Sequence, residues 1–149
     1  MMIKKALIGK CKAEIIAKIK AIEQEMENLK ISLGAETKSS AGDKYETSRE
    51  MMNQEKGKLQ SQMAVLNQQL ETLSKINTSI KHQKVCLGSI VRTSAALYFI
   101  SISYGKITIE KDQVFMISAI TPLAQQMIDK MVGEEVVWNG KSILIEEIE

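Results

Sequence analysis

Three acidic residues lie close together in a short polar stretch of this sequence. Glu36, Asp43 and Glu46 are the carboxylates between Leu33 and Thr47, and the last two have the spacing Asp-x-x-Glu. Carboxylate oxygens are hard ligands that suit Mg²⁺, and a metal ion held by them can position an attacking water. These three carboxylates are therefore the candidate oxygen ligands of the stretch, with Asp43 and Glu46 at the Asp-x-x-Glu spacing and Glu36 as a third candidate.

The same acids have a structural alternative. Asp43 can cap a following helix, and Glu46 three residues later can reach back in a variant of the capping box. Nitrogen and sulfur ligands give no competing site, because Cys11, Cys86 and His82 lack the paired spacing of a zinc or redox motif. We expect no intrinsic cofactor.

Two apolar ladders predict the elements that position these acids. The first ladder alternates spacings of four and three, as in a coiled-coil seam, at Ile15, Ile19, Ile22, Met26, Leu29 and Leu33. The second recurs every seven residues, with Met63 and Leu70 between its members, at Tyr45, Met52, Leu59, Leu66, Leu73 and Ile80. We predict an antiparallel helical hairpin over residues 1–80, with a tip at about 34–44 where Gly34 ends the first helix.

The second ladder degrades toward the tip. Arg49 and Lys56 occupy positions that Met63 and Leu70 fill further along the same ladder. We therefore expect the tip half of the hairpin to be looser and more polar than the other half.

The rest of the chain predicts a small sheet domain over residues 85–149, after a linker at 81–84. Strands are expected at 89–93, 96–103, 106–110, 113–119, 135–138 and 141–148, because these runs are rich in β-branched or aromatic residues. Thr121 and Pro122 predict the start of one short helix, and Asn139-Gly140 predicts a tight hairpin. The fold class is α+β: a coiled-coil hairpin followed by a small antiparallel sheet with one helix.

The composition is typical of a globular protein and does not indicate a particular function. The chain has 149 residues, 44% of them hydrophobic, and a formal net charge of +2. That charge is weak evidence for nucleic-acid binding, and the lysines of the first helix are more simply a solvated coiled-coil face. No run is long and apolar enough for a signal peptide or a membrane span, so we expect a cytoplasmic protein without membrane contact.

Two local segments carry a resemblance to a known family. Asp43–Glu50 contains a tyrosine followed four and five residues later by Arg49 and Glu50, and Ile117–Ala124 contains Thr121-Pro122-Leu123-Ala124 ahead of Gly133–Val136. With this order of elements, the chain resembles the Gre family of bacterial transcript cleavage factors. The resemblance implies an FKBP-like fold for the second domain, without prolyl isomerase activity.

The resemblance also implies a function and a partner. A Gre-like elongation factor binds RNA polymerase at the secondary channel and inserts its coiled-coil tip toward the active site, near the nascent RNA. Asp43, Glu46 and Glu36 would then share Mg²⁺ with the polymerase, so that the factor completes an active site rather than owning one. Ile120, Thr121, Pro122 and Leu123 match the family's segment and are the expected polymerase-binding residues.

Three functions stay open at this point. The family's tip carries Asp-x-x-Glu shortly after a glycine, whereas Gly34 is followed by Ala35-Glu36-Thr37-Lys38 and the loop is about three residues longer. The chain could stimulate cleavage of backtracked RNA, or bind the channel and modulate or inhibit polymerase without cleavage. A coiled-coil scaffold or chaperone-like protein is the third reading.

Overall fold

The computed structural model describes residues 2–36 and 42–149, with side chains for residues 3–34 and 46–149. Two long helices, α1 (Met2–Glu36) and α2 (Gly42–Ser74), precede six strands and one short helix. The chain forms two compact units: residues 1–11 with 71–149, here called the sheet unit, and Lys12–Leu70, here called the hairpin unit. The predicted α+β fold, a helical hairpin followed by a small sheet with one short helix, is confirmed.

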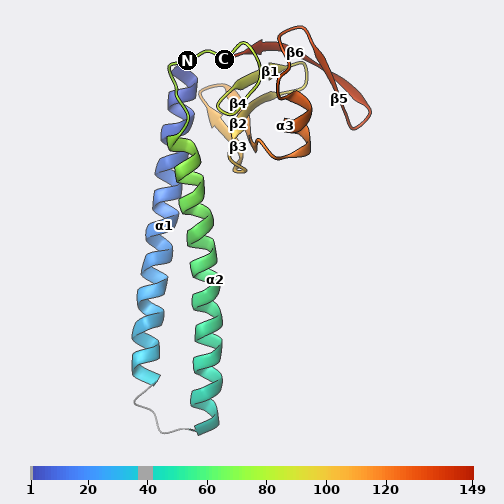
Figure 1. The fold of residues 1–149 in the computed structure, drawn as a ribbon. Coiled ribbons are helices and arrows are strands. Elements are labelled where there is room, and N and C mark those ends of the chain that lie inside the picture. The colour runs from blue at the N-terminus through green and yellow to red at the C-terminus, as the bar shows by residue number, and fades with distance from the viewer. Residues whose placement is uncertain (1, 37–41) are drawn as a thin grey trace. The chain divides into compact units, whose positions relative to one another are not determined.

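In the hairpin unit, α1 and α2 run antiparallel beside each other (Figure 1). Ile15 and Leu59 are buried at the seam. The other predicted seam positions of this unit with described side chains are half-buried: Ile19, Ile22, Met26, Leu29, Leu33, Met52, Met63, Leu66 and Leu70. Apolar burial stabilises by about 25 cal/mol per Å² removed from water, so a two-helix seam gains less than a closed core would.

Both helix boundaries near the tip differ from the prediction. Helix α1 continues through Gly34 to Glu36, because a glycine costs a helix interior only about 1 kcal/mol and does not by itself end it. Helix α2 begins at Gly42, so Asp43 lies within the first turn and is not the N-cap residue. Residues 37–41 of the predicted tip, 34–44, lie outside the described residues.

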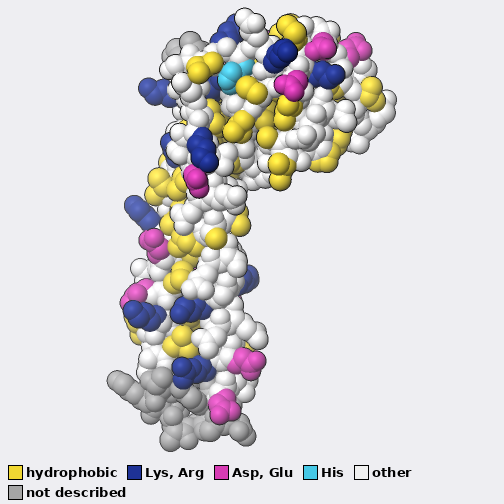
Figure 2. Space-filling model, in the orientation of Figure 1, with side chains coloured by type: hydrophobic (Ala, Val, Ile, Leu, Met, Phe, Trp, Pro, Cys, Tyr) yellow, Lys and Arg dark blue, Asp and Glu magenta, His cyan; other side chains and the backbone are white. Residues whose placement is uncertain are grey.

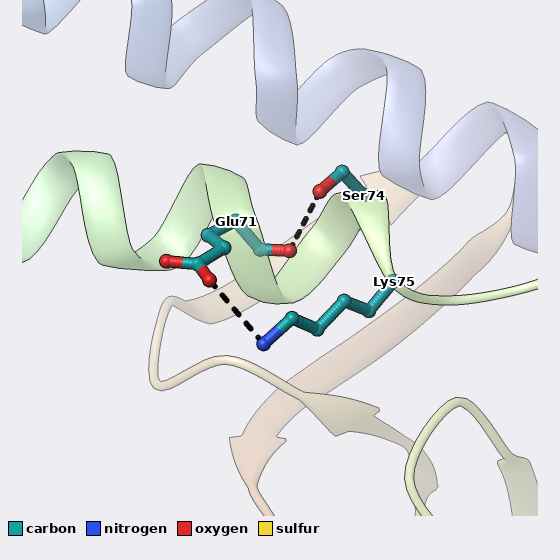
Figure 3. Close-up of polar contacts among 3 residues, drawn as sticks. All are labelled: Glu71, Ser74 and Lys75. Carbon is teal, nitrogen blue, oxygen red and sulfur yellow. Dashed lines mark hydrogen bonds and ion pairs between the residues drawn. The ribbon is translucent and has the colours of Figure 1, made fainter.

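The far end of α2 also differs from the prediction. The helix ends at Ser74, whose Oγ donates to the Glu71 carbonyl at 2.7 Å, and Lys75 Nζ lies 3.3 Å from Glu71 Oε1 (Figure 3). Asn77 Oδ1 then accepts the Ser79 N–H at 2.9 Å, a side-chain bond that competes with continued helix. Ile80, the predicted last seam residue, lies beyond the helix and is 49% exposed.

The sheet unit holds one six-stranded sheet in the order β3-β4-β2-β1-β6-β5. The strands are β1 (Ile90–Thr93), β2 (Leu97–Ser101), β3 (Gly105–Ile109), β4 (Asp112–Ser118), β5 (Glu135–Trp138) and β6 (Lys141–Ile148). Neighbours are antiparallel except β2 and β4, which are parallel, with Leu97 opposite Val114 and Ser101 opposite Ser118. The sheet is antiparallel, as predicted, except for that pair, in which β4 lies beside β2 after forming a hairpin with β3.

The predicted tight turn between β5 and β6 is confirmed. Asn139 and Gly140 have φ angles of 53° and 75°, the left-handed pair that a two-residue hairpin of type I′ requires. Trp138 pairs with Lys141 and Glu135 pairs with Leu144, so the register of both strands follows from this turn.

The sheet is covered on both faces within its unit. On one face Ala124 and Met127 of α3 (Pro122–Met127) pack in a core with Val91, Val136 and Ile145. On the other face Cys11 Sγ of α1 lies 3.0 Å from Met116 Sδ, and Phe99 beside it is fully buried. No helix in the described part of the chain is long and apolar enough to cross a membrane.

Candidate functional site

The three predicted tip acids lie at the facing ends of the two long helices. Glu36 is the last residue of α1, and Asp43 and Glu46 lie in the first turns of α2. The side chains of Glu36 and Asp43 fall outside the described residues, whereas Glu46 is exposed. The backbone therefore brings the helix ends that carry these acids to one end of the hairpin unit. Among described residues, no group of three or more potential ligands could hold a metal ion.

Helix polarity favours acids at this end of α2. The unpaired N–H groups of a first turn carry partial positive charge, which stabilises a nearby carboxylate by about 0.3–1 kcal/mol. Glu46 continues into an open polar surface with Arg49 and Glu50, one turn further along α2. Glu46 and Glu50 thus present carboxylate oxygens on the exposed surface of α2 near its start.

The second predicted site is the turn that joins β4 to α3. Thr121 is the N-cap of α3: its Oγ1 accepts the Ala124 N–H at 3.4 Å and donates to the Ser118 carbonyl at 2.8 Å. Pro122 occupies the first helical turn, where its missing N–H costs nothing. Gln125 Nε2 donates to the Ala119 carbonyl at 2.6 Å and closes the turn from the other side.

These hydrogen bonds fix the turn. Of the four predicted binding residues, two are exposed on it and two hold it in place. Ile120 is 83% exposed, and Pro122 is exposed beside it. Thr121 is half-buried and caps the helix, while Leu123 packs against the buried core of the sheet unit. The available apolar contact is therefore Ile120 with Pro122, held on a rigid turn by the other two.

A buried polar cluster in the sheet unit was not predicted. Lys4 is fully buried and donates from Nζ to the Ile80 carbonyl at 3.2 Å. Burial lowers the pKa of Lys4, and the neighbouring Glu149 and Cys86 act in the opposite direction. The sequence contained a signal of this burial, because Lys4 shares the helical spacing of the apolar residues Leu7, Cys11 and Ile15. The lysines of this helix were predicted to be surface charges, so the signal was missed.

The centre of this cluster is the buried hydroxyl of Ser89. Its Oγ lies 2.8 Å from His82 Nδ1, accepts the Cys86 N–H at 2.9 Å and lies 3.6 Å from Cys86 Sγ. Burial, and after it the charge of Lys4, lowers the pKa of His82. With Ser89 fully buried, this cluster ties the start of α1 to the segment after α2 rather than presenting a nucleophile.

Comparison with solved structures finds a distant similarity, whereas the other two comparisons find no match. No protein-family model matches the chain, and no curated protein matches it. A solved structure described as the transcription factor Gfh1 matches with a TM-score of 0.36 and 14% sequence identity, covering 92% of each chain. At this TM-score the two folds are only loosely similar, so the function of the present chain is inferred from its own residues and fold.

Proposed function

We propose that this protein is a Gre-like transcription factor that binds RNA polymerase at its secondary channel. The proposal rests on the positions of the two family-like segments in the fold. Asp43–Glu50 forms the first turns of α2, and Ile117–Ala124 forms the turn from β4 into α3. Each segment lies in an element that has the position along the chain expected for the family.

The hairpin is long and narrow enough to place the charged residues of its tip in a distant active site. The part of α1 in the hairpin unit, residues 12–36, has 25 residues, which at about 1.5 Å per residue gives about 37 Å. Two helices with a single seam are also slender, because each presents a narrow apolar stripe. In the proposal this rod enters the channel and brings the tip acids to the polymerase's catalytic metal.

The tip acids would act by completing a metal site. Carboxylates of Asp43 and Glu46, with Glu36, would help to hold a second Mg²⁺ that polarises the attacking water. The chain would supply ligands and position, and the polymerase would supply the remaining ligands and the RNA. Stimulated cleavage of backtracked RNA is the activity that follows.

In the sheet unit, Ile120 would bind the rim of the channel. An isoleucine held at 83% exposure on a hydrogen-bonded turn buries its apolar area on binding without further ordering of the backbone. Pro122 beside it extends the contact, and Thr121 and Leu123 hold the turn in place.

A second function is favoured by one observation at the tip. Gly34 is followed by Ala35-Glu36-Thr37-Lys38 and not by the family's acidic pair, and Gly34 lies inside α1. A factor with that tip would occupy the channel and modulate or inhibit polymerase without cleavage. It would keep the same binding surface on the sheet unit.

The test combines binding with cleavage. Purified protein is mixed with core RNA polymerase, and the retained complex is then supplied with a stalled, backtracked transcript. Binding with shortening of the RNA supports the cleavage factor, and binding without shortening supports the modulator. Failure to co-purify with polymerase rejects both and leaves the scaffold reading.

Ile120→Asp tests the proposed grip, with Gln126→Asp as its matched control. Gln126 is exposed on α3, the short helix that follows the Ile120 turn, so the control introduces the same charge nearby. We expect the first variant to lose polymerase binding and the second to keep it. Equal binding by both folded variants would remove Ile120 from the interface.

A further inference from the structure

Helix α1 contacts the outer edge of the sheet through one lysine. Lys10 donates from Nζ to the Thr108 carbonyl at 3.0 Å, although the two residues are 98 positions apart in the sequence. The next residue along the helix, Cys11, is buried against Met116 of β4, and this packing holds Lys10 beside β3. Both residues of the hydrogen bond belong to the sheet unit.

The position of Lys10 is not the result of a crowded basic surface. On the face seen in Figure 2, Lys and Arg side chains are spread over the surface rather than gathered in one patch. An exposed lysine ordinarily keeps its ammonium in water. A role for Lys10 must therefore come from the carbonyl that it contacts.

The Thr108 carbonyl lies on the free side of an edge strand. β3 is at one end of the sheet order, beside β4. Ile109 pairs with Asp112 across their tight turn, and hydrogen-bonded pairs alternate along an antiparallel ladder from that point. Ile107 therefore bonds to β4, whereas the N–H and C=O groups of Lys106 and Thr108 point away from the sheet.

An outward row of backbone groups is a template for pairing with another strand. β3 is complementary to itself in this respect. When two copies pair antiparallel with Ile107 opposite Ile107, Lys106 of one copy lies opposite Thr108 of the other. Each such pair can exchange both of its N–H···O bonds about a two-fold axis, so the edge fits a second copy of this chain.

We propose that Lys10 closes the edge of β3 against pairing with a second copy of this chain. Its Nζ occupies the Thr108 carbonyl, which is the acceptor that the Lys106 N–H of the second copy would need. The ammonium also adds positive charge at an edge where Lys106 is exposed, and the second copy would bring the same two cations. Like charges that face each other across a strand pair destabilise it.

This role of Lys10 is separate from the proposed binding of polymerase. The hydrogen bond joins α1 to β3 and involves neither Ile120 nor the tip acids. Lys10 is also exposed, so its replacement leaves the buried side of α1 in place. Its effect can therefore be measured on the full-length protein alone.

The first test replaces Lys10 by methionine, which keeps the length of the side chain and removes the ammonium. Sedimentation equilibrium should show that Lys10→Met self-associates about tenfold or more tightly than the wild type, because a wild-type pair breaks one Lys10 hydrogen bond in each copy. Lys5→Met makes the same exchange at an exposed position of the same helix and should associate as the wild type does.

A second substitution assigns the association to β3. Thr108→Pro removes an outward N–H that the ladder with β4 does not use, and proline is tolerated at such an edge position. The double variant Lys10→Met/Thr108→Pro should return to the association of the wild type, and circular dichroism checks that it is folded.

Amide hydrogen exchange gives an independent readout on Lys10→Met alone. Exchange of the Lys106 and Thr108 amides should slow as the protein concentration rises, because pairing places both N–H groups in hydrogen bonds. This measurement decides the question even where the double variant does not fold.

The proposal is overturned when Lys10→Met associates no more tightly than the wild type or than Lys5→Met. Association of a folded double variant, or association without slower exchange at Lys106 and Thr108, would place the contact on another surface. Slow, concentration-dependent exchange of these amides in the wild type would mean that Lys10 leaves the edge open.

Discussion

At the residue scale, the metal-binding role proposed for the tip acids can be separated from their effect on helix stability. A carboxylate in the first turn of α2 stabilises the helix through its interaction with the unpaired N–H groups, by about 0.3–1 kcal/mol. The negative charge of a carboxylate strengthens its binding of a divalent cation, and a neutral amide oxygen binds the cation more weakly. A substitution that keeps the shape and removes the charge therefore separates the two roles.

Asp43→Asn is expected to abolish cleavage of backtracked RNA while the protein keeps its melting temperature within a few degrees. Asparagine replaces aspartate at equal size, and the lost dipole interaction costs at most about 1 kcal/mol. Glu50→Gln, an exposed acid further along α2, is the matched control and should cleave normally. Cleavage by Asp43→Asn at the wild-type rate would exclude this carboxylate from the metal site.

The environment of His82 predicts a pH-dependent contribution to the stability of the sheet unit. Burial lowers the pKa of His82 below its usual 6.5, so the unfolded chain binds a proton more readily than the folded one. Stability contributed by neutral His82 is therefore present above pH 6.5. It is lost as the pH falls from 6.5 toward the lower pKa of the folded state.

Lys4→Met should raise the pKa of His82, because it removes the neighbouring ammonium and leaves the burial in place. The chain contains one histidine, so a single imidazole signal in an NMR titration reports the change. Lys5→Met, at an exposed position, is the control and should leave the titration unaltered. A wild-type midpoint at or above 6.5 would contradict the described environment.

At the element scale, the hairpin should be least stable where its seam is interrupted. Lys56→Leu is expected to stabilise the hairpin by about 1 kcal/mol, because leucine restores an apolar residue between Met52 and Leu59 on the ladder. Amide hydrogen exchange should show slower exchange over residues 46–56 in the variant. In the wild type, exchange there should be faster than over 59–73.

A result that contradicts this expectation is equal protection of both ranges in the wild type. The matched control is Lys58→Leu, which adds the same side chain at an exposed position that is not on the ladder. Its effect on exchange should be small. A similar gain from both variants would point to leucine's apolar surface in general and not to the seam.

Elements set by local chemistry could be predicted from the sequence. Asn139 and Gly140 accept left-handed φ angles, so β5 and β6 were predicted with their observed bounds. Thr121 and Pro122 likewise predicted the start of α3. These signals are contained within a few neighbouring residues.

Elements set by distant contacts could not be predicted in the same way. The parallel pairing of β2 with β4 depends on which edge β3 occupies, and no local motif specifies that. Lys4 is buried because the start of α1 packs within the sheet unit, whereas its sequence neighbour Lys5 is exposed. Neither fact is visible in the spacing of nearby residues.

At the scale of the whole molecule, the proposed binding and cleavage functions lie in different compact units. Ile120 belongs to the sheet unit, and Asp43 belongs to the hairpin unit. Substitutions at such separate sites act independently unless their units are coupled. A variant that has lost cleavage through Asp43 should therefore keep polymerase binding, whereas loss of binding through Ile120 also removes cleavage.

This separation predicts that Asp43→Asn inhibits the wild-type protein in a mixture. An excess of the variant should occupy the secondary channel through the intact sheet unit and suppress cleavage by the wild type in proportion to its share of the total. Adding Ile120→Asp to the same variant should relieve the inhibition, because the double variant no longer competes for polymerase. A transcript cleavage assay at fixed wild-type concentration measures both effects. Equal inhibition by the single and double variants would mean that the hairpin unit binds the channel without the Ile120 turn. The polymerase-binding surface would then lie along α1 and α2.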